Sequence, residues 1–98
     1  RYGKPVGIDM ETIEERSSGF YDMVFTDHEL TLLKDRDQAE WTTRFWVAKE
    51  AYGKFLGTGL KGNPKAFEVE LIKDDHLWIN NIEIKTIKHQ NYIIGWTL

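Results

Sequence analysis

Hydrophobic residues recur between residues 38 and 56 at spacings of three and four, which places them on one side of a helix. The members of this apolar stripe are Trp41, Phe45, Ala48, Tyr52 and Leu56. Gly57 follows directly, at the position where a C-cap glycine belongs. The pattern predicts a long helix from about Gln38 to Leu56, with the stripe packed on the rest of the fold.

A second, shorter helix is predicted just before the long one. Thr26 and Glu29 fit a capping box, in which Thr26 is the N-cap and Glu29 reaches back to its amide. This helix should run to about Arg36 and turn three leucines inward, which are Leu30, Leu32 and Leu33. The two serines before Gly19 predict a loop upstream of it.

Alternation of apolar and polar residues predicts strands on both sides of the helices. The expected strands are residues 6–11, 67–71, 76–79, 82–87 and 92–98. Asn80-Asn81 tolerates the positive φ of a tight hairpin, whereas residues 73–75 are expected to form a turn and residues 58–64 a loop. The order of strand, two helices and antiparallel meander predicts an α+β domain, with the long helix packed on the sheet.

Composition limits the possible functions. The chain has 98 residues, enough for one small domain, and it starts with Arg1, so we expect a piece of a longer protein. It has no cysteine, which excludes disulfides and thiolate metal sites. The net charge of −3 disfavours a nucleic-acid partner. There is no signal peptide and no apolar run of about 20 residues, so we expect no membrane partner and a cytoplasmic location.

Residues 31–65 carry seven lysines and arginines against four acids, a local charge of +3 within an acidic chain. A basic middle suits an anionic ligand or an acidic partner. The same charges also fit a solvated helix face of mixed sign.

Three carboxylates form a candidate metal site. Asp9 and Glu11 are two residues apart on a predicted strand, so both side chains point to the same face. Glu50 lies on the long helix, opposite the apolar stripe. Together they would offer hard oxygen ligands suited to Mg²⁺, with water and a substrate phosphate completing the shell. Alternatively, all three are surface acids.

Lys54 follows Glu50 by one helical turn, on the same side. The simplest interpretation of this spacing is a surface ion pair between the two residues. Trp46 and Val47 flank them away from the stripe, and a solvated face needs neither. We therefore expect this second face of the helix to pack against another subunit or domain.

Two segments carry a resemblance to a known family. Gly7-Ile8-Asp9-Met10-Glu11 resembles the strand motif of phosphopantetheinyl transferases, G-[IV]-D-[IL]-E. The segment 45–54, which contains Lys49-Glu50 and Lys54, resembles their second signature, [FW]-x-x-K-E-[AS]-x-x-K. Residues 25–29 and 56–60 look like the helix start between the two motifs and the loop after the second. The two motifs occur in the family's order, on the predicted strand and helix.

The resemblance implies a reaction and a role for each residue. Asp9, Glu11 and Glu50 would hold Mg²⁺ on the pyrophosphate of coenzyme A. Glu50, or a water that it orients, would take the proton from a serine of an apo carrier protein. Lys54 would neutralise charge on the phosphate, and Lys49 and Lys54 would bind coenzyme A. The products would be the holo carrier protein and 3′,5′-ADP.

The chain resembles the second half of the surfactin-type enzymes, which contain two such halves, or a single holo-acyl-carrier-protein synthase unit, which forms trimers. We therefore expect either a second half-domain or a homo-oligomer as partner. Two alternatives remain at this point. The chain is a non-catalytic half-domain that acts as a docking or assembly module, or it is an unrelated structural α+β domain.

Overall fold

The computed structural model describes residues 6–60 and 62–98. Its elements follow the order β1(Ile8–Thr12), α1(Ser18–Val24), α2(Asp27–Leu33), α3(Gln38–Leu56), a 3₁₀ turn at Pro64–Ala66, β2(Leu71–Lys73), β3(His76–Ile79), β4(Ile82–His89) and β5(Tyr92–Thr97). Within these residues, no helix is both long enough and apolar enough to cross a membrane.

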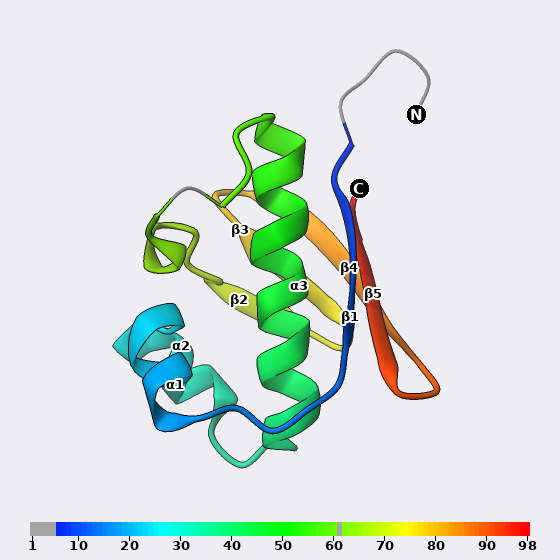
Figure 1. Ribbon diagram of the computed structural model, residues 1–98. Helices are drawn as coiled ribbons and strands as arrows, with labels where there is room; N and C mark the ends of the chain where they lie inside the picture. Colours follow the sequence, from blue (N-terminus) through cyan, green and yellow to red (C-terminus); the bar gives the residue numbers. More distant parts are fainter. Residues whose placement is uncertain (1–5, 61) are drawn as a thin grey trace.

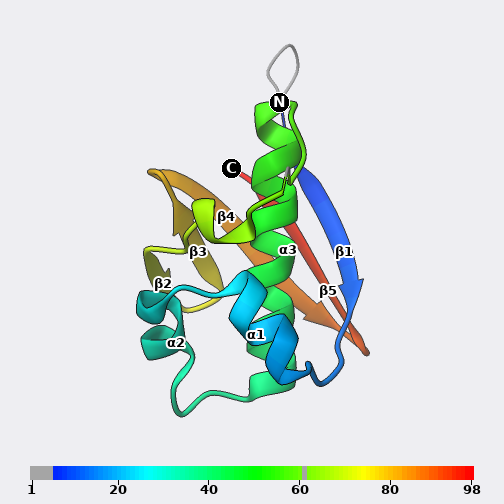
Figure 2. The same cartoon turned by 60° about the vertical axis from the view of Figure 1, so that its left-hand side comes forward.

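All five strands form one antiparallel sheet in the order β1-β5-β4-β3-β2. The first strand is thus an edge strand that pairs with the last one, and Asp9 lies opposite Gly95. Helix α3 lies along the sheet, while α1 and α2 lie beside the N-terminal half of α3 (Figures 1 and 2). This arrangement confirms the predicted α+β class with the long helix packed on the sheet.

Local sequence signals account for several elements. Helix α3 has the predicted bounds; the Asp37 side chain accepts from the Glu40 amide at its start, and Gly57 ends it at φ 80°. The Thr26–Glu29 capping box is present at the start of α2. Asn80 and Asn81 both have positive φ, as a tight hairpin requires.

Three local predictions were wrong. The segment before α2 contains the helix α1 and not only a loop, because the Ser17 side chain caps it by accepting from the Phe20 amide. Helix α2 ends at Leu33, three residues before Arg36, and Leu30 on it is 40% exposed. Residues 67–70 form no strand, since β2 starts only at Leu71.

Helix α3 is buried on several sides and not only along its apolar stripe. Its buried residues are Thr42, Thr43, Arg44, Phe45, Val47, Ala48, Lys49, Ala51, Tyr52 and Gly53. Val47 is fully buried, with its Cγ1 against Gly95 of β5, and the Trp46 ring meets the Phe20 ring of α1 edge to face. The prediction that Val47 packs against another subunit or domain was therefore wrong, because this chain's own β5 buries it, whereas Trp46 is only partly covered by α1.

Candidate functional site: an acidic cluster between β1 and α3

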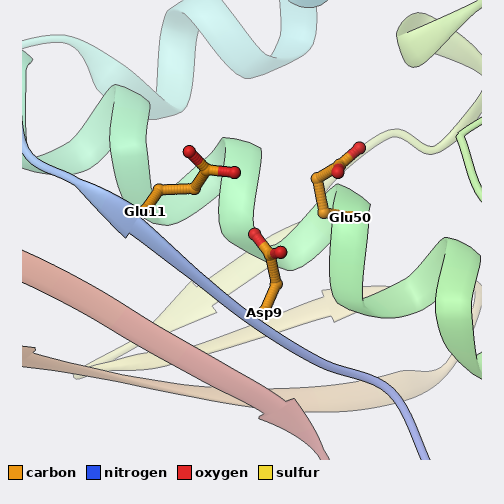
Figure 3. A group of neighbouring side chains, drawn as sticks. All are labelled: Asp9, Glu11 and Glu50. Carbon is orange, nitrogen blue, oxygen red and sulfur yellow. The ribbon is translucent and has the colours of Figure 1, made fainter.

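The three predicted carboxylates come together in the fold. Asp9 and Glu11 point from β1 toward α3, and Glu50 points from α3 into the same space (Figure 3). One carboxylate oxygen from each residue lies within 4.8 Å of one from each of the others. Asp9 is 8% exposed, whereas Glu11 and Glu50 are partly exposed. The cluster is therefore buried at Asp9 and open to solvent at Glu11 and Glu50.

Gly7 makes this convergence possible. A Cβ at this position would lie 1.8 Å from the backbone oxygen of Ala51 and 2.8 Å from the amide nitrogen of Phe55, so no side chain fits. Its amide donates to Thr97 Oγ1 at 3.0 Å, which fixes β1 on β5. The glycine lets β1 lie directly on the backbone of α3, and that close approach brings Asp9 to the helix.

Lys54 completes the cluster. Its Nζ donates to Asp9 Oδ1 at 3.0 Å and to the backbone oxygen of Ile8 at 3.1 Å. The lysine side chain is 50% exposed, so it lies at the rim of the site. The partner of Lys54 is thus Asp9 on the neighbouring strand and not Glu50 one turn away, which rules out the simple surface ion pair on the helix.

The electrostatics of the cluster disfavour three ionised acids. Burial, followed by Asp9 and Glu50, raises the pKa of Glu11, and the charge of Arg16 opposes this shift. Burial and Asp9 likewise raise the pKa of Glu50, while Lys54 lowers it. Asp9 Oδ2 is buried and has no hydrogen-bond partner. A divalent cation would satisfy that oxygen and offset the repulsion, so the residues fit Mg²⁺.

Lys49 lies on the opposite, inner side of the helix. It is fully buried, and its Nζ pairs with Glu29 at 2.8 Å and donates to the backbone oxygens of Pro64 and Phe67 at 2.9 and 3.1 Å. These three partners use all the hydrogens of the ammonium group. The expectation that Lys49 contacts coenzyme A thus has no support in this geometry, since the side chain stabilises the fold from within.

Two contributors to the site escaped prediction. The sequence identified Gly7 only as part of the strand motif. Its contact with the backbone of α3 joins distant residues and could not be predicted from neighbouring residues. Arg16, on the segment after β1, donates to Thr43 Oγ1 of α3 at 2.9 Å and influences Glu11. A lone arginine in a loop carries no periodicity that would have singled it out.

With this geometry established, comparison with known proteins places the chain. Residues 5–97 match the family described as ACPS, the 4′-phosphopantetheinyl transferase superfamily. The chain belongs to this superfamily. The membership confirms the resemblance carried by the strand motif at Gly7–Glu11 and by the helix motif that contains Glu50 and Lys54.

Curated superfamily members resemble this chain along most of its length. The holo-[acyl-carrier-protein] synthase of Streptococcus agalactiae is 39% identical over 79 residues, which cover 70% of this chain and 66% of that protein. The synthase of Alkaliphilus oremlandii is 35% identical, with coverage of 72% and 63%. The L-aminoadipate-semialdehyde dehydrogenase-phosphopantetheinyl transferase of Eremothecium gossypii is 40% identical, with coverage of 64% and 26%. The chain thus spans just under two thirds of the synthases it matches.

A solved structure shares the superfamily fold. The holo-[acyl-carrier-protein] synthase of Thermotoga maritima superposes with a TM-score of 0.74 at 21% identity, covering 95% of this chain and 61% of that one. The likeness confirms that the helices and the five-stranded sheet adopt the architecture of that synthase.

Proposed function

We propose that the chain is a transferase unit that moves the phosphopantetheine arm of coenzyme A to a serine of an apo acyl- or peptidyl-carrier protein, releasing 3′,5′-ADP. The observation that carries the proposal is the convergence of Asp9, Glu11 and Glu50 within 4.8 Å of one another, beside Lys54. Superfamily membership supplies the reaction class. Several relatives are called holo-[acyl-carrier-protein] synthases, which supports a carrier protein as acceptor.

Asp9, Glu11 and Glu50 would hold Mg²⁺, with the unpartnered Asp9 Oδ2 as the most buried ligand. When bound, Mg²⁺ would withdraw charge from the pyrophosphate oxygens of coenzyme A. Three oxygens from two elements leave room for further ligands on the open side of the cluster.

Glu50 and Lys54 divide the remaining work. Glu50 is partly exposed and its pKa is raised, chiefly by burial, so it suits accepting the proton of the carrier serine directly or through a water. The serine oxygen bonds to the β-phosphorus of coenzyme A while the bond from that phosphorus to the bridging oxygen breaks. Lys54, half exposed at the rim, lies where its ammonium group can neutralise charge that grows on the phosphate oxygens.

The outer face of the sheet supports assembly with a second unit of the same fold. Ile8 and Met10 alternate with the site acids and are 58% and 59% exposed, pointing away from α3. Their strand neighbours on β5 are Trp96 and Ile94. A hollow of about 510 Å³ on this side is lined by Val6, Gly7, Ile8, Ile94, Trp96, Thr97 and Leu98.

We infer that this outer face contacts either a second copy or another half-domain, because a group of exposed apolar side chains of this kind marks a protein interface. Sedimentation of Ile8→Asp protein checks the contact: the change should lower the mass of any homo-oligomer, with Leu71→Asp, at the far edge of the sheet, as the control. Unchanged assembly in Ile8→Asp protein would rule this face out.

The proposed function is tested by mass spectrometry of an apo carrier protein after incubation with this protein, coenzyme A and Mg²⁺. The expected result is a carrier whose serine has gained phosphopantetheine, with 3′,5′-ADP released and the reaction stopped by EDTA. If the outer-face contact forms but no carrier is modified, the unit is an assembly module and not an enzyme.

A further inference from the structure

Arg16 lies outside the set of acidic residues, yet its side chain is almost as buried as that of Asp9. The exposed fractions are 10% for the Arg16 side chain and 8% for that of Asp9. Arginine is seldom buried unless it is paired. The carboxylate within ion-pair distance of Arg16 belongs to Glu14, whose side chain is 61% exposed, and Arg16 Nε is buried without a partner. A surface ion pair of this kind does not explain the burial.

The other contacts of Arg16 join β1 to α3. Its Nη2 donates to Thr43 Oγ1 at 2.9 Å and approaches the backbone oxygen of Thr12 at 3.4 Å. The guanidinium carbon lies 5.0 Å from the centroid of the Phe20 ring, which supports it from α1. Thr43 in turn donates to the backbone oxygen of Ala39, so the acceptor itself is anchored on the helix.

The position of these contacts along the helix is informative. Thr43 precedes Glu50 by seven residues, or about two turns, so both lie on the same side of α3. Lys54, one turn beyond Glu50, bonds the backbone oxygen of Ile8 at the start of β1. Arg16 reaches Thr12 at the end of the same strand. Lys54 therefore connects the start of β1 to α3, and Arg16 connects its end to α3. The acidic cluster lies between these two connections.

We propose that Arg16 is a positioning residue, which fixes the Glu11 end of β1 against α3 so that Glu11 stays within reach of a cation shared with Asp9 and Glu50. This inference rests on the proposed magnesium site. It assigns Arg16 no contact with substrate, since its polar contacts are to Thr12, Glu14 and Thr43.

Charge adds to the geometric argument. Three acids and two nearby bases, Lys54 and Arg16, leave the cluster one negative charge when all are ionised. Lys54 supplies its charge at the Ile8 end of β1 and Arg16 at the Thr12 end, so the two positive charges lie on either side of the acids along the strand.

The test is a titration of the protein with Mn²⁺ followed by electron paramagnetic resonance, with Mn²⁺ as a probe for the magnesium site. Arg16→Met should weaken Mn²⁺ binding by roughly 10- to 100-fold, the usual effect of losing a group that orients a metal ligand. Arg16→Lys should also weaken it, because lysine keeps the charge but lacks the planar guanidinium that lies against the Phe20 ring and holds Nη2 between Thr12 and Thr43. Glu14→Gln removes only the exposed contact and should bind Mn²⁺ normally.

Wild-type affinity in the Arg16→Met protein would overturn the proposal. If Arg16→Lys bound Mn²⁺ with wild-type affinity while Arg16→Met did not, the proposal would also be overturned. The positive charge of Arg16, and not the position it gives to β1, would then explain the effect on Mn²⁺ binding. Urea unfolding of each variant shows that the protein compared is folded.

Amide hydrogen exchange keeps the test independent of the metal. Exchange at residues 11–13 should be faster in Arg16→Met than in wild type, without a matching change in β3 and β4. If wild-type protein binds no Mn²⁺, the proposed metal site fails, but faster exchange would still support the connection between Arg16 and α3. Unchanged exchange would refute the connection itself.

Discussion

Lys54 on α3 and Asp9 on β1 are 45 residues apart in sequence, and their side chains meet at 3.0 Å. The same lysine binds the backbone oxygen of Ile8, so it fixes the strand as well as the carboxylate. Only one oxygen of Asp9 is used in this contact, because Oδ2 has no hydrogen-bond partner. The pair thus leaves the second oxygen of Asp9 without a partner, and in the proposed magnesium site this oxygen would be the one that binds the cation.

Replacing Lys54 with methionine should slow transfer to the carrier protein by roughly 10²–10³, the usual effect of removing one group that stabilises transition-state charge. The fold should survive, since the side chain is half exposed. Lys88→Met is a matched control, because Lys88 is 52% exposed and pairs with Glu40 away from the cluster. Equal rates for the two variants, measured by mass spectrometry of the carrier, would remove Lys54 from the mechanism.

Glu50→Gln should lower the transfer rate by about 10²–10⁴, because it removes the proposed base, and it should also weaken Mg²⁺ binding. Stability should change by less than about 0.5 kcal/mol, as for most partly exposed positions. Glu40 is not a suitable control, since it forms an ion pair with Arg44 at 2.9 Å and its side chain is only 19% exposed. The exposed Glu15 serves instead, and Glu15→Gln should retain full activity.

Because the pKa of Glu11 is raised, replacing its carboxyl group should increase the free energy of unfolding by an amount that depends on pH. Between the ordinary value of 4.5 and the raised value, the folded protein binds more protons than the unfolded chain, so the free energy of unfolding falls as pH rises. Glu11→Gln should therefore match wild type near pH 4 and be the more stable protein at pH 7 without divalent cations. The gain should stay below about 1 kcal/mol, because Glu11 is partly exposed.

Urea unfolding at both pH values checks this expectation. Adding Mg²⁺ at pH 7 should reverse the order, because only wild type keeps the full set of ligands. A Glu11→Gln protein that is less stable than wild type without metal would show that the acids do not repel one another.

Lys49→Met should destabilise the protein by roughly 3–5 kcal/mol, because it leaves the Glu29 carboxylate buried without its counter-charge. The double variant Lys49→Met/Glu29→Gln should recover part of this loss, since glutamine removes the buried negative charge. Its single oxygen can accept from only one of the Thr26 and Val69 amides, which now donate to different oxygens of Glu29. Chemical denaturation measures both effects. A cost below about 1 kcal/mol for Lys49→Met would mean that the lysine is not held inside, and contact with coenzyme A would again be the better explanation.

Gly7→Ala should push β1 away from α3, because its Cβ would overlap the backbone oxygen of Ala51. The expected cost is about 1–3 kcal/mol, as for other overpacked sites, together with weaker binding of Mg²⁺ measured by calorimetry. Gly19→Ala is the control: it lies in α1, where its Cβ would meet only Ser17 Oγ at 3.8 Å, so alanine should stabilise this helix slightly. Normal metal affinity in Gly7→Ala protein would show that the strand contact does not set the cluster.

Local signals in the sequence predicted the elements whose ends are fixed by nearby residues. Helix α3 ends at Gly57 and the β3–β4 hairpin turns at Asn80-Asn81, both through positive φ. Helix α1 was missed because Ser17 and Gly19 are common in loops, and only the cap on the Phe20 amide distinguishes a helix. The acids were identified from their motifs, whose spacing places them on one strand face and one helix.

Features that depend on contacts between residues far apart in the chain could not be predicted from the sequence. The face of α3 that bears Val47 was expected to need a partner, because a single apolar stripe was taken as the whole core. Strand β5 covers it only because Gly95 lets the strand approach Val47, and that contact joins residues 48 positions apart. Lys49 and Glu50 are adjacent in the motif, yet one lies inside the protein and the other at the cluster.

The sheet order sets the sequence of events during synthesis of the chain. Strand β1 is synthesised before the other strands described here, but its neighbour in the sheet is β5, the last of them. The strand that carries Asp9 and Glu11 can therefore pair in the sheet only after residues 92–97 have been synthesised, and such pairing of segments far apart in sequence is intrinsically slow. The earlier elements can collapse around α3 without it. The acidic cluster should consequently be complete only once residues 92–97 have paired with β1.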